Sequence, residues 1–101
     1  MWVVKSKFVG NQGTYTITEE SATSELYANA KFTRQLMTWL ERIGKRNVSQ
    51  LMKDKFPEII NDPDYYKAFN TFLHEQIQEE LDKTNVDAEI KSTFEIEIYE
   101  V

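Results

Sequence analysis

The segment Ser24–Ile43 limits the possible folds most, because it predicts one long helix with an apolar surface on more than one side. One apolar stripe recurs at helical spacing and comprises Leu26, Ala30, Thr33, Met37 and Leu40. A second stripe runs beside it and comprises Phe32, Leu36, Trp39 and Ile43. A helix of this length spans roughly 30 Å, about the diameter of a small domain. We therefore expect it to contact a sheet on one side and other helices on the other.

The residues that flank this helix are typical of helix ends. Ser21, Thr23 and Ser24 all favour the N-cap position. Gly44 follows the apolar stripes and suits the left-handed position just beyond a helix C-terminus. The sequence therefore predicts a helix that ends at Ile43.

Two short segments before this helix predict a β-hairpin. Residues 2–9 alternate weakly between apolar and lysine-bearing positions. Residues 14–18 alternate between threonines on one face and Tyr15 and Ile17 on the other. The cluster at 10–13, bounded by glycines, separates the two segments and favours a turn.

Two further helices are expected after the first one. Residues 48–56 predict a short helix, which Pro57 ends, since the residue before a proline disfavours helical geometry. The third helix starts with Asp62 as N-cap and Pro63 in the first turn, and Asn85 can stop it. Its apolar stripe comprises Tyr66, Phe69, Leu73, Ile77 and Leu81.

The tail of the chain has the clearest strand pattern. One face of the alternation comprises Val86, Ala88, Ile90, Ser92, Phe94, Ile96 and Ile98. The other face is mostly charged, which is typical of a strand that faces water on one side. A break is expected near Lys91.

These elements predict the order β-β-α-α-α-β and an α+β class, with three helices packed on one face of a three-stranded antiparallel sheet. The last strand is expected beside the first, because this places Lys5 and Lys7 across from Glu95 and Glu97. Such pairs contribute roughly 0.2–1 kcal/mol each. The charges therefore favour the strand order 2-1-3.

Length and composition predict a single α+β domain over residues 1–101. The chain has no cysteine, so disulfides, thiolate nucleophiles and cysteine-based zinc sites are excluded. We find no apolar leader near the start and no run of about 18 apolar residues. An intracellular, cytoplasmic and soluble protein is therefore expected.

The sequence contains no recognisable catalytic constellation. His74 is the only histidine, and Gln78 one turn later breaks the carboxylate spacing that a metal site would need. The glycine cluster at 10–13 lacks the pattern of a phosphate-binding loop. We therefore expect no enzyme activity, no catalytic residue, no metal and no cofactor.

The charge is unevenly distributed along the chain. Residues 31–55 hold seven Lys or Arg and two acidic residues, net +5, whereas residues 56–101 hold three Lys and twelve acidic residues, net −9. Such blocks either face each other in the fold or bind charged partners. The candidate acidic binding residues are Glu75, Glu79, Glu80, Asp82 and Asp87. The alternative is a nucleic-acid-binding site formed by Arg42, Lys45, Arg46, Lys53 and Lys55.

In size, composition and charge the chain resembles small, cysteine-free, acidic proteins carried by phages and plasmids, including anti-CRISPR and anti-restriction proteins. The resemblance implies a non-enzymatic inhibitor that presents acidic surface where a nucleic-acid-handling enzyme expects phosphates. The leading expectation is an interaction protein that binds a partner protein through its charged surface. The alternative is a small nucleic-acid-binding protein that uses the basic segment 31–55.

Overall fold

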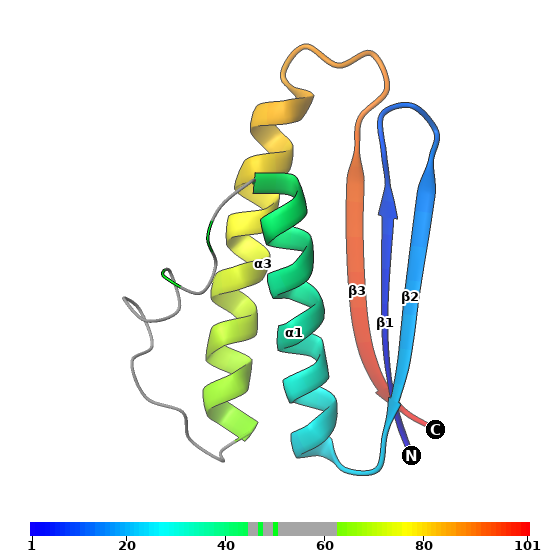
Figure 1. Ribbon diagram of the computed structural model, residues 1–101, viewed down its shortest axis with the longest axis vertical. Helices are drawn as coiled ribbons and strands as arrows, with labels where there is room; N and C mark the ends of the chain where they lie inside the picture. Colours follow the sequence, from blue (N-terminus) through cyan, green and yellow to red (C-terminus); the bar gives the residue numbers. More distant parts are fainter. Residues whose placement is uncertain (45–46, 48–49, 51–62) are drawn as a thin grey trace.

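The computed structural model describes residues 1–44, 47, 50 and 63–101. Its elements are β1 (Trp2–Val9), β2 (Tyr15–Ala22), α1 (Glu25–Gly44), α3 (Pro63–Asn85) and β3 (Thr93–Glu100). Figure 1 shows α1 between α3 and the three strands. Within the described residues, neither helix is long and apolar enough to cross a membrane.

The sheet is antiparallel throughout, and its strand order is β2-β1-β3, as predicted. The register places Lys5 opposite Glu97 and Lys7 opposite Glu95 on β3. Lys5 also lies opposite Glu19 on β2. Positive charge on the central strand is therefore flanked by negative charge on both edge strands. The charge match that favoured this strand order is confirmed by the register.

The turn between β1 and β2 is a compact hairpin connection. Gly13 donates its backbone N–H to the Gly10 carbonyl at 3.0 Å, and Gly10 donates to the Thr14 carbonyl at 2.7 Å. Gly13 has a φ of 82°, a left-handed conformation that glycine adopts without strain. This pattern matches the common three-residue hairpin that ends in a glycine bulge. The predicted turn at 10–13 is therefore confirmed.

The helices form two layers behind the sheet. α1 packs against all three strands and against α3, whereas α3 packs chiefly against α1. α3 reaches the sheet at β3, where the rings of His74 and Phe94 meet edge to face with centroids 6.2 Å apart. Three strands about 4.8 Å apart are only about as wide as one helix, so one helix covers the sheet and the next packs behind it.

The prediction of three helices on one face of the sheet is therefore wrong. In the described part of the chain two helices are present, and only one of them lies across the sheet. Of the short helix expected over residues 48–56, only Gln50 is described, and its backbone N–H donates to Oδ1 of Asn47 at 3.2 Å.

The core is divided into two clusters of buried apolar side chains. The larger cluster comprises Leu36, Trp39, Leu40, Leu73, Ile77, Leu81 and Phe94. The smaller cluster comprises Val4, Ala22 and Ala28. The Trp39 ring links α1 to the sheet, with its centroid 4.9 Å from that of Phe8 and 6.0 Å from that of Phe94. The apolar stripe predicted for the third helix is confirmed, since its members from Phe69 onward are buried.

Polar side chains occupy part of the buried face of α1, and of these the predicted stripes included Thr33 but not Asn29 or Gln35. Asn29 donates to the Glu25 carbonyl at 3.0 Å. The Thr33 hydroxyl lies 2.9 Å from the Asn29 carbonyl oxygen and 2.5 Å from Oδ1 of Asn70 on α3. Buried polar groups must find such partners, so this contact favours one alignment of the two helices.

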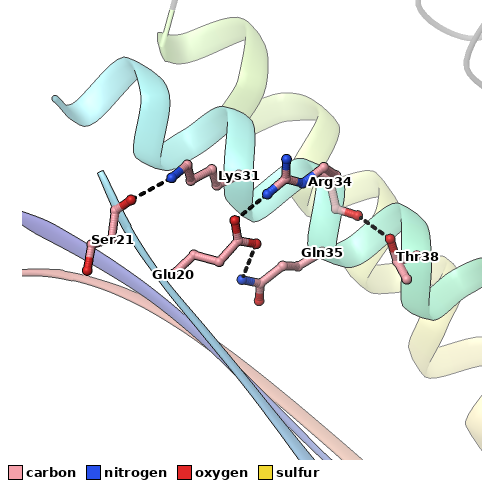
Figure 2. Close-up of polar contacts among 6 residues, drawn as sticks. All are labelled: Glu20, Ser21, Lys31, Arg34, Gln35 and Thr38. Atoms are coloured by element: carbon pink, nitrogen blue, oxygen red, sulfur yellow. Dashed lines mark hydrogen bonds and ion pairs between the residues drawn. The ribbon is translucent and has the colours of Figure 1, made fainter. Parts of the chain in front are cut away.

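A second polar group joins α1 to β2 (Figure 2). Glu20 on β2 accepts hydrogen bonds from Arg34 and, at 3.0 Å, from Nε2 of Gln35. One turn earlier on the helix, Lys31 Nζ donates to the backbone carbonyl of Ser21 at 2.5 Å. These contacts hold the second half of β2 against the helix.

The ends of α1 agree only in part with the sequence prediction. The Ser24 hydroxyl accepts the backbone N–H of Tyr27 at 3.3 Å, so the predicted N-cap is confirmed. At the other end the helix includes Gly44, and the described glycine with positive φ is Gly13. The expectation of a left-handed Gly44 beyond Ile43 is therefore wrong, because the helical hydrogen bonding continues one residue further.

The last strand is shorter than its alternation predicted. It begins at Thr93, and the side chains of Val86 and Ile90 are exposed in the connection before it. The chain turns sharply after α3, where Ala88 donates its backbone N–H to the Asn85 carbonyl at 3.2 Å. The alternation of apolar and charged residues does not reveal this change of direction, so the strand predicted from residue 86 is wrong over about its first half, residues 86–92.

Candidate protein-binding surface

The acidic residues predicted on the third helix fall into an exposed stripe on α3 and two separate positions. Glu75, Glu79 and Asp82 are spaced by four and three residues, so they lie on one face of the helix. That face is opposite the buried stripe that runs through Leu73 and Ile77. All three residues are exposed. We call these three residues the acidic stripe.

Glu80 and Asp87 do not belong to the acidic stripe. The Glu80 side chain is only 17% exposed and lies 3.6 Å from the ammonium group of Lys83. Asp87 is exposed, but it lies in the connection between α3 and β3 rather than on the helix. The structure therefore brings together three of the five acidic residues that the sequence nominated.

The lysines of α3 pair with carboxylates that do not belong to the acidic stripe. Lys67 Nζ lies 3.4 Å from Glu25 and 3.9 Å from Asp64, and Lys83 pairs with Glu80. Asp82 accepts a hydrogen bond from the neutral Gln78 amide at 3.0 Å. Among the residues that the structure describes, no Lys or Arg forms an ion pair with the acidic stripe.

The alternative basic site can be described only at Arg42. Its guanidinium lies over the Trp39 ring, with Cζ 5.1 Å from the ring centroid, and its side chain is exposed. Such a cation–π contact holds the group at the end of α1 without neutralising its charge. The other four residues of this site, Lys45, Arg46, Lys53 and Lys55, lie outside the described residues.

His74 makes a packing contact with the sheet and is not part of a metal-binding cluster in the described chain. Its ring packs edge to face on Phe94 at the junction of α3 and β3. In the described part of the chain, no group of three histidine or acidic side chains is placed to hold a metal ion.

The outer face of the sheet is a second exposed surface, as the charged positions of the predicted strands indicated. No helix of the described chain packs on this face, because α1 and α3 lie on the other side. Its lysine and glutamate rows are accompanied on β2 by Tyr15 and Ile17, which are 61% and 46% exposed. Lys7 Nζ lies 5.4 Å from the centroid of the Tyr15 ring. The alternation of residues 14–18 did not reveal that Tyr15 and Ile17 belong to this exposed face.

A hollow lies where the hairpin turn meets the ends of both helices. It is lined in part by Gly10, Trp39, Arg42 and Thr84. No pair of these side chains forms an acid–base or nucleophile arrangement, so the hollow has no evident chemistry.

Comparison of the chain with protein-family models, with curated proteins and with solved structures gave no match.

Proposed function

We propose that this chain is a non-enzymatic protein-binding module that uses the acidic stripe of α3 to bind a basic surface of a partner protein. The observation that supports this proposal most is the position of Glu75, Glu79 and Asp82. They are exposed, lie opposite the core and form no ion pair with a Lys or Arg of the described chain, since the nearby Lys83 pairs with Glu80.

An unneutralised stripe of this kind has no stabilising role in the fold. Like charges one turn apart on a helix destabilise it by a few tenths of a kcal/mol per pair. Glu75 and Glu79 form such a pair. A partner that supplies Lys or Arg side chains would remove this repulsion and form charge-assisted hydrogen bonds with the carboxylates.

The partner is proposed to be a protein whose basic surface handles nucleic acid, so that the acidic stripe occupies phosphate-binding positions and inhibits it. Three carboxylates carried by one helix have a preformed backbone, so binding them requires ordering of their side chains but no ordering of a loop. Inhibition of a CRISPR or restriction nuclease is the most specific form of this proposal.

The test compares two triple variants that change the net charge equally. The first, Glu75→Gln, Glu79→Gln and Asp82→Asn, removes the acidic stripe. The matched control, Glu19→Gln, Glu95→Gln and Glu97→Gln, removes three carboxylates from the outer face of the sheet. Both variants should keep the native circular dichroism spectrum.

The proposal expects the stripe variant to lose a partner recovered from the native source, while the control retains it. The association rate of the unchanged chain should fall steeply with salt. Equal retention by both variants would exclude the stripe, and equal loss would show that only total charge matters. If the stripe variant keeps its partner and changes at Arg42, Lys45, Arg46, Lys53 and Lys55 abolish a nucleic-acid complex in a gel shift, the alternative function holds.

A further inference from the structure

The backbone of β2 has a free edge whose position follows from two hydrogen bonds. In an antiparallel ladder, directly opposed residues alternate between hydrogen-bonded and non-hydrogen-bonded pairs. Gly10 donates to Thr14 at 2.7 Å, so even-numbered residues of β1 bond to β2. At the other edge, Val101 donates to Met1 at 2.7 Å, so odd-numbered residues of β1 bond to β3. The two assignments agree, because each residue of β1 serves one neighbour only.

The odd-numbered residues of β2 therefore direct their backbone N–H and C=O groups away from the sheet. These residues are Tyr15, Ile17, Glu19 and Ser21. The Ser21 carbonyl confirms this direction, since it accepts the Lys31 ammonium group at 2.5 Å from beside the strand (Figure 2). Among the described residues, the backbone groups of the other three have no partner. We call Tyr15, Ile17 and Glu19 the free edge of β2.

The protection of this edge strand is limited to two glutamates, Glu19 on the free edge itself and Glu20 on the face towards α1. β2 contains no proline, no lysine and no bulge, and it pairs with β1 over eight consecutive residues. The side chains along the free edge include Tyr15 and Ile17, both large, apolar and exposed. An edge with so little protection can act as a template for another strand, provided that the partner strand compensates the Glu19 charge.

We propose that the free edge of β2 pairs antiparallel with the free edge of a second copy of this chain, so that two three-stranded sheets become one six-stranded sheet. A two-fold axis at Ile17 would place Ile17 opposite its own copy and Tyr15 opposite Glu19 of the second copy. All three free residues on each chain would then be hydrogen-bonded, which forms about six backbone hydrogen bonds.

The side chains of β2 are complementary to their own copies in this register. Glu19 of one copy approaches Tyr15 of the other, whose ring already lies beneath Lys7 at 5.4 Å. On the opposite face Thr16 meets Thr18, and threonine pairs are favourable across strands. Each copy therefore places a carboxylate beside a phenol and a cation.

Other registers are worse for identifiable reasons. A shift of the axis to Glu19 places two Glu19 carboxylates opposite each other and uses the Ser21 carbonyl, which Lys31 already occupies. A shift to Tyr15 carries the pairing into the hairpin turn at Gly13, whose φ is 82°. An unrelated peptide gains the same backbone hydrogen bonds but not this pairing of side chains, so the second copy is the favoured occupant.

Cross-linking through single cysteines tests the register directly, because the chain has no cysteine of its own. In the proposed dimer the two Ile17 Cα atoms are about 5.5 Å apart, which a disulfide can bridge. The two Tyr15 Cα atoms would be at least about 13 Å apart, since four residues of strand separate them. The Ile17→Cys chain should form a disulfide dimer under mild oxidation at high concentration, and the Tyr15→Cys chain should not.

The second measurement is the mass of the unchanged chain in solution over a concentration series. Pairing of one short edge buries less than a stable interface needs, so the dimer should dissociate on dilution. Ile17→Pro should abolish it while the fold remains, because the Ile17 N–H faces away from β1. The matched control Thr93→Lys, at an exposed site on the other edge strand, should leave it intact.

Three results would overturn the proposal. They are a chain that stays monomeric at millimolar concentration, a dimer that survives Ile17→Pro, and equal cross-linking of the Ile17→Cys and Tyr15→Cys chains. Binding of an extended foreign peptide to β2 by a chain that stays monomeric would also overturn it, since the occupant would then be another protein. Ile17→Lys repeats the test if Ile17→Pro does not fold.

Discussion

Asn85 holds the backbone of Ser92 through two hydrogen bonds of 2.9 Å each, donating from Nδ2 to the carbonyl and accepting the N–H at Oδ1. A side-chain amide carries the same donor and acceptor as a peptide group, so Asn85 replaces a strand neighbour at this point. It joins the last residue of α3 to the residue that precedes β3. A single side chain therefore fixes the two ends of the connection between α3 and β3 relative to each other.

Asn85→Ala should lower the free energy of unfolding by about 1–3 kcal/mol, because it leaves both backbone groups of the buried Ser92 without partners. Asn85→Asp should also destabilise, since a carboxylate cannot donate to the carbonyl. Urea unfolding measures the change. The control is Thr84→Ala, which removes an exposed hydroxyl bonded to the Glu80 carbonyl and should change stability by less than about 0.5 kcal/mol. If Asn85→Ala matches this control, the bridge to Ser92 contributes nothing.

Phe94→Asp should unfold the chain at room temperature or lower its melting midpoint severely. Phe94 is 7% exposed and packs against Trp39, so the variant loses the ring and buries an unpaired carboxylate. Glu95→Gln changes the next residue, on the exposed face opposite Lys7, and should cost less than about 1 kcal/mol. Thermal unfolding of the two variants compares the faces of β3. Similar midpoints would contradict the assignment of Phe94 to the core.

Glu20→Ala should destabilise the fold more than Arg34→Ala, although the two side chains form one ion pair. Arg34 is 64% exposed and its removal should cost less than about 1 kcal/mol. Removal of Glu20 also strips the acceptor from the amide of Gln35, which is buried, so a cost of about 1–3 kcal/mol is expected. Equilibrium unfolding in guanidinium measures both. The reverse ranking would show that Gln35 finds another acceptor.

Gly13→Ala should cost about 1–2 kcal/mol although no atom lies within 4 Å of the added methyl group. The cost comes from the φ of 82°, which an L-residue with a Cβ adopts unfavourably. Gly13→Asn is the matched comparison, because asparagine tolerates the left-handed region better than alanine. Calorimetric melting should rank glycine above asparagine above alanine. An alanine variant as stable as the parent would show that the turn changes its conformation.

The sheet order and much of the core were predictable because they depend on patterns that the sequence displays directly. The strand order followed from Lys5 and Lys7 facing Glu95 and Glu97, and the register bears this out. The stripe on α3 followed from spacing alone. Its exposed side was predictable for the same reason, since a helix with one buried face leaves the opposite face in water.

The sequence predictions were wrong where the position of a residue depends on a turn or on contact with another part of the fold. Val86 and Ile90 continue the alternation of β3, but the turn after α3 takes them out of the sheet. Asn29 and Asn70 are polar residues that are nevertheless buried, because Asn29 donates to the Glu25 carbonyl within α1 and Asn70 contacts the Thr33 hydroxyl across the two helices. Glu79 and Glu80 look equivalent in the sequence. Only the position of the buried face of α3 shows that Glu80 is largely covered and pairs with Lys83.

The predicted strand order 2-1-3 placed the second strand at an edge of the sheet, but it did not show which of its backbone groups face outward. Tyr15 and Ile17 were predicted to share a face, and they do, but nothing in their spacing says whether another strand lies beyond them. That depends on which strand lies in the centre of the sheet. The hydrogen bond from Gly10 to Thr14 then decides which backbone groups point outward.

The central position of β1 also has a consequence for how quickly the chain folds. One neighbour of β1 follows directly after a turn, whereas the other brings Phe8 against Phe94 from the far end of the sequence. Local hairpins form in about 1–10 μs, but contacts between distant residues slow folding because a large loop must close first. Pulse-labelling hydrogen exchange should therefore protect the amides shared by β1 and β2 before those shared by β1 and β3, and simultaneous protection would contradict this order. During that interval both edges of the hairpin are unpaired, which makes the late arrival of β3 the step at which this chain is most exposed to aggregation.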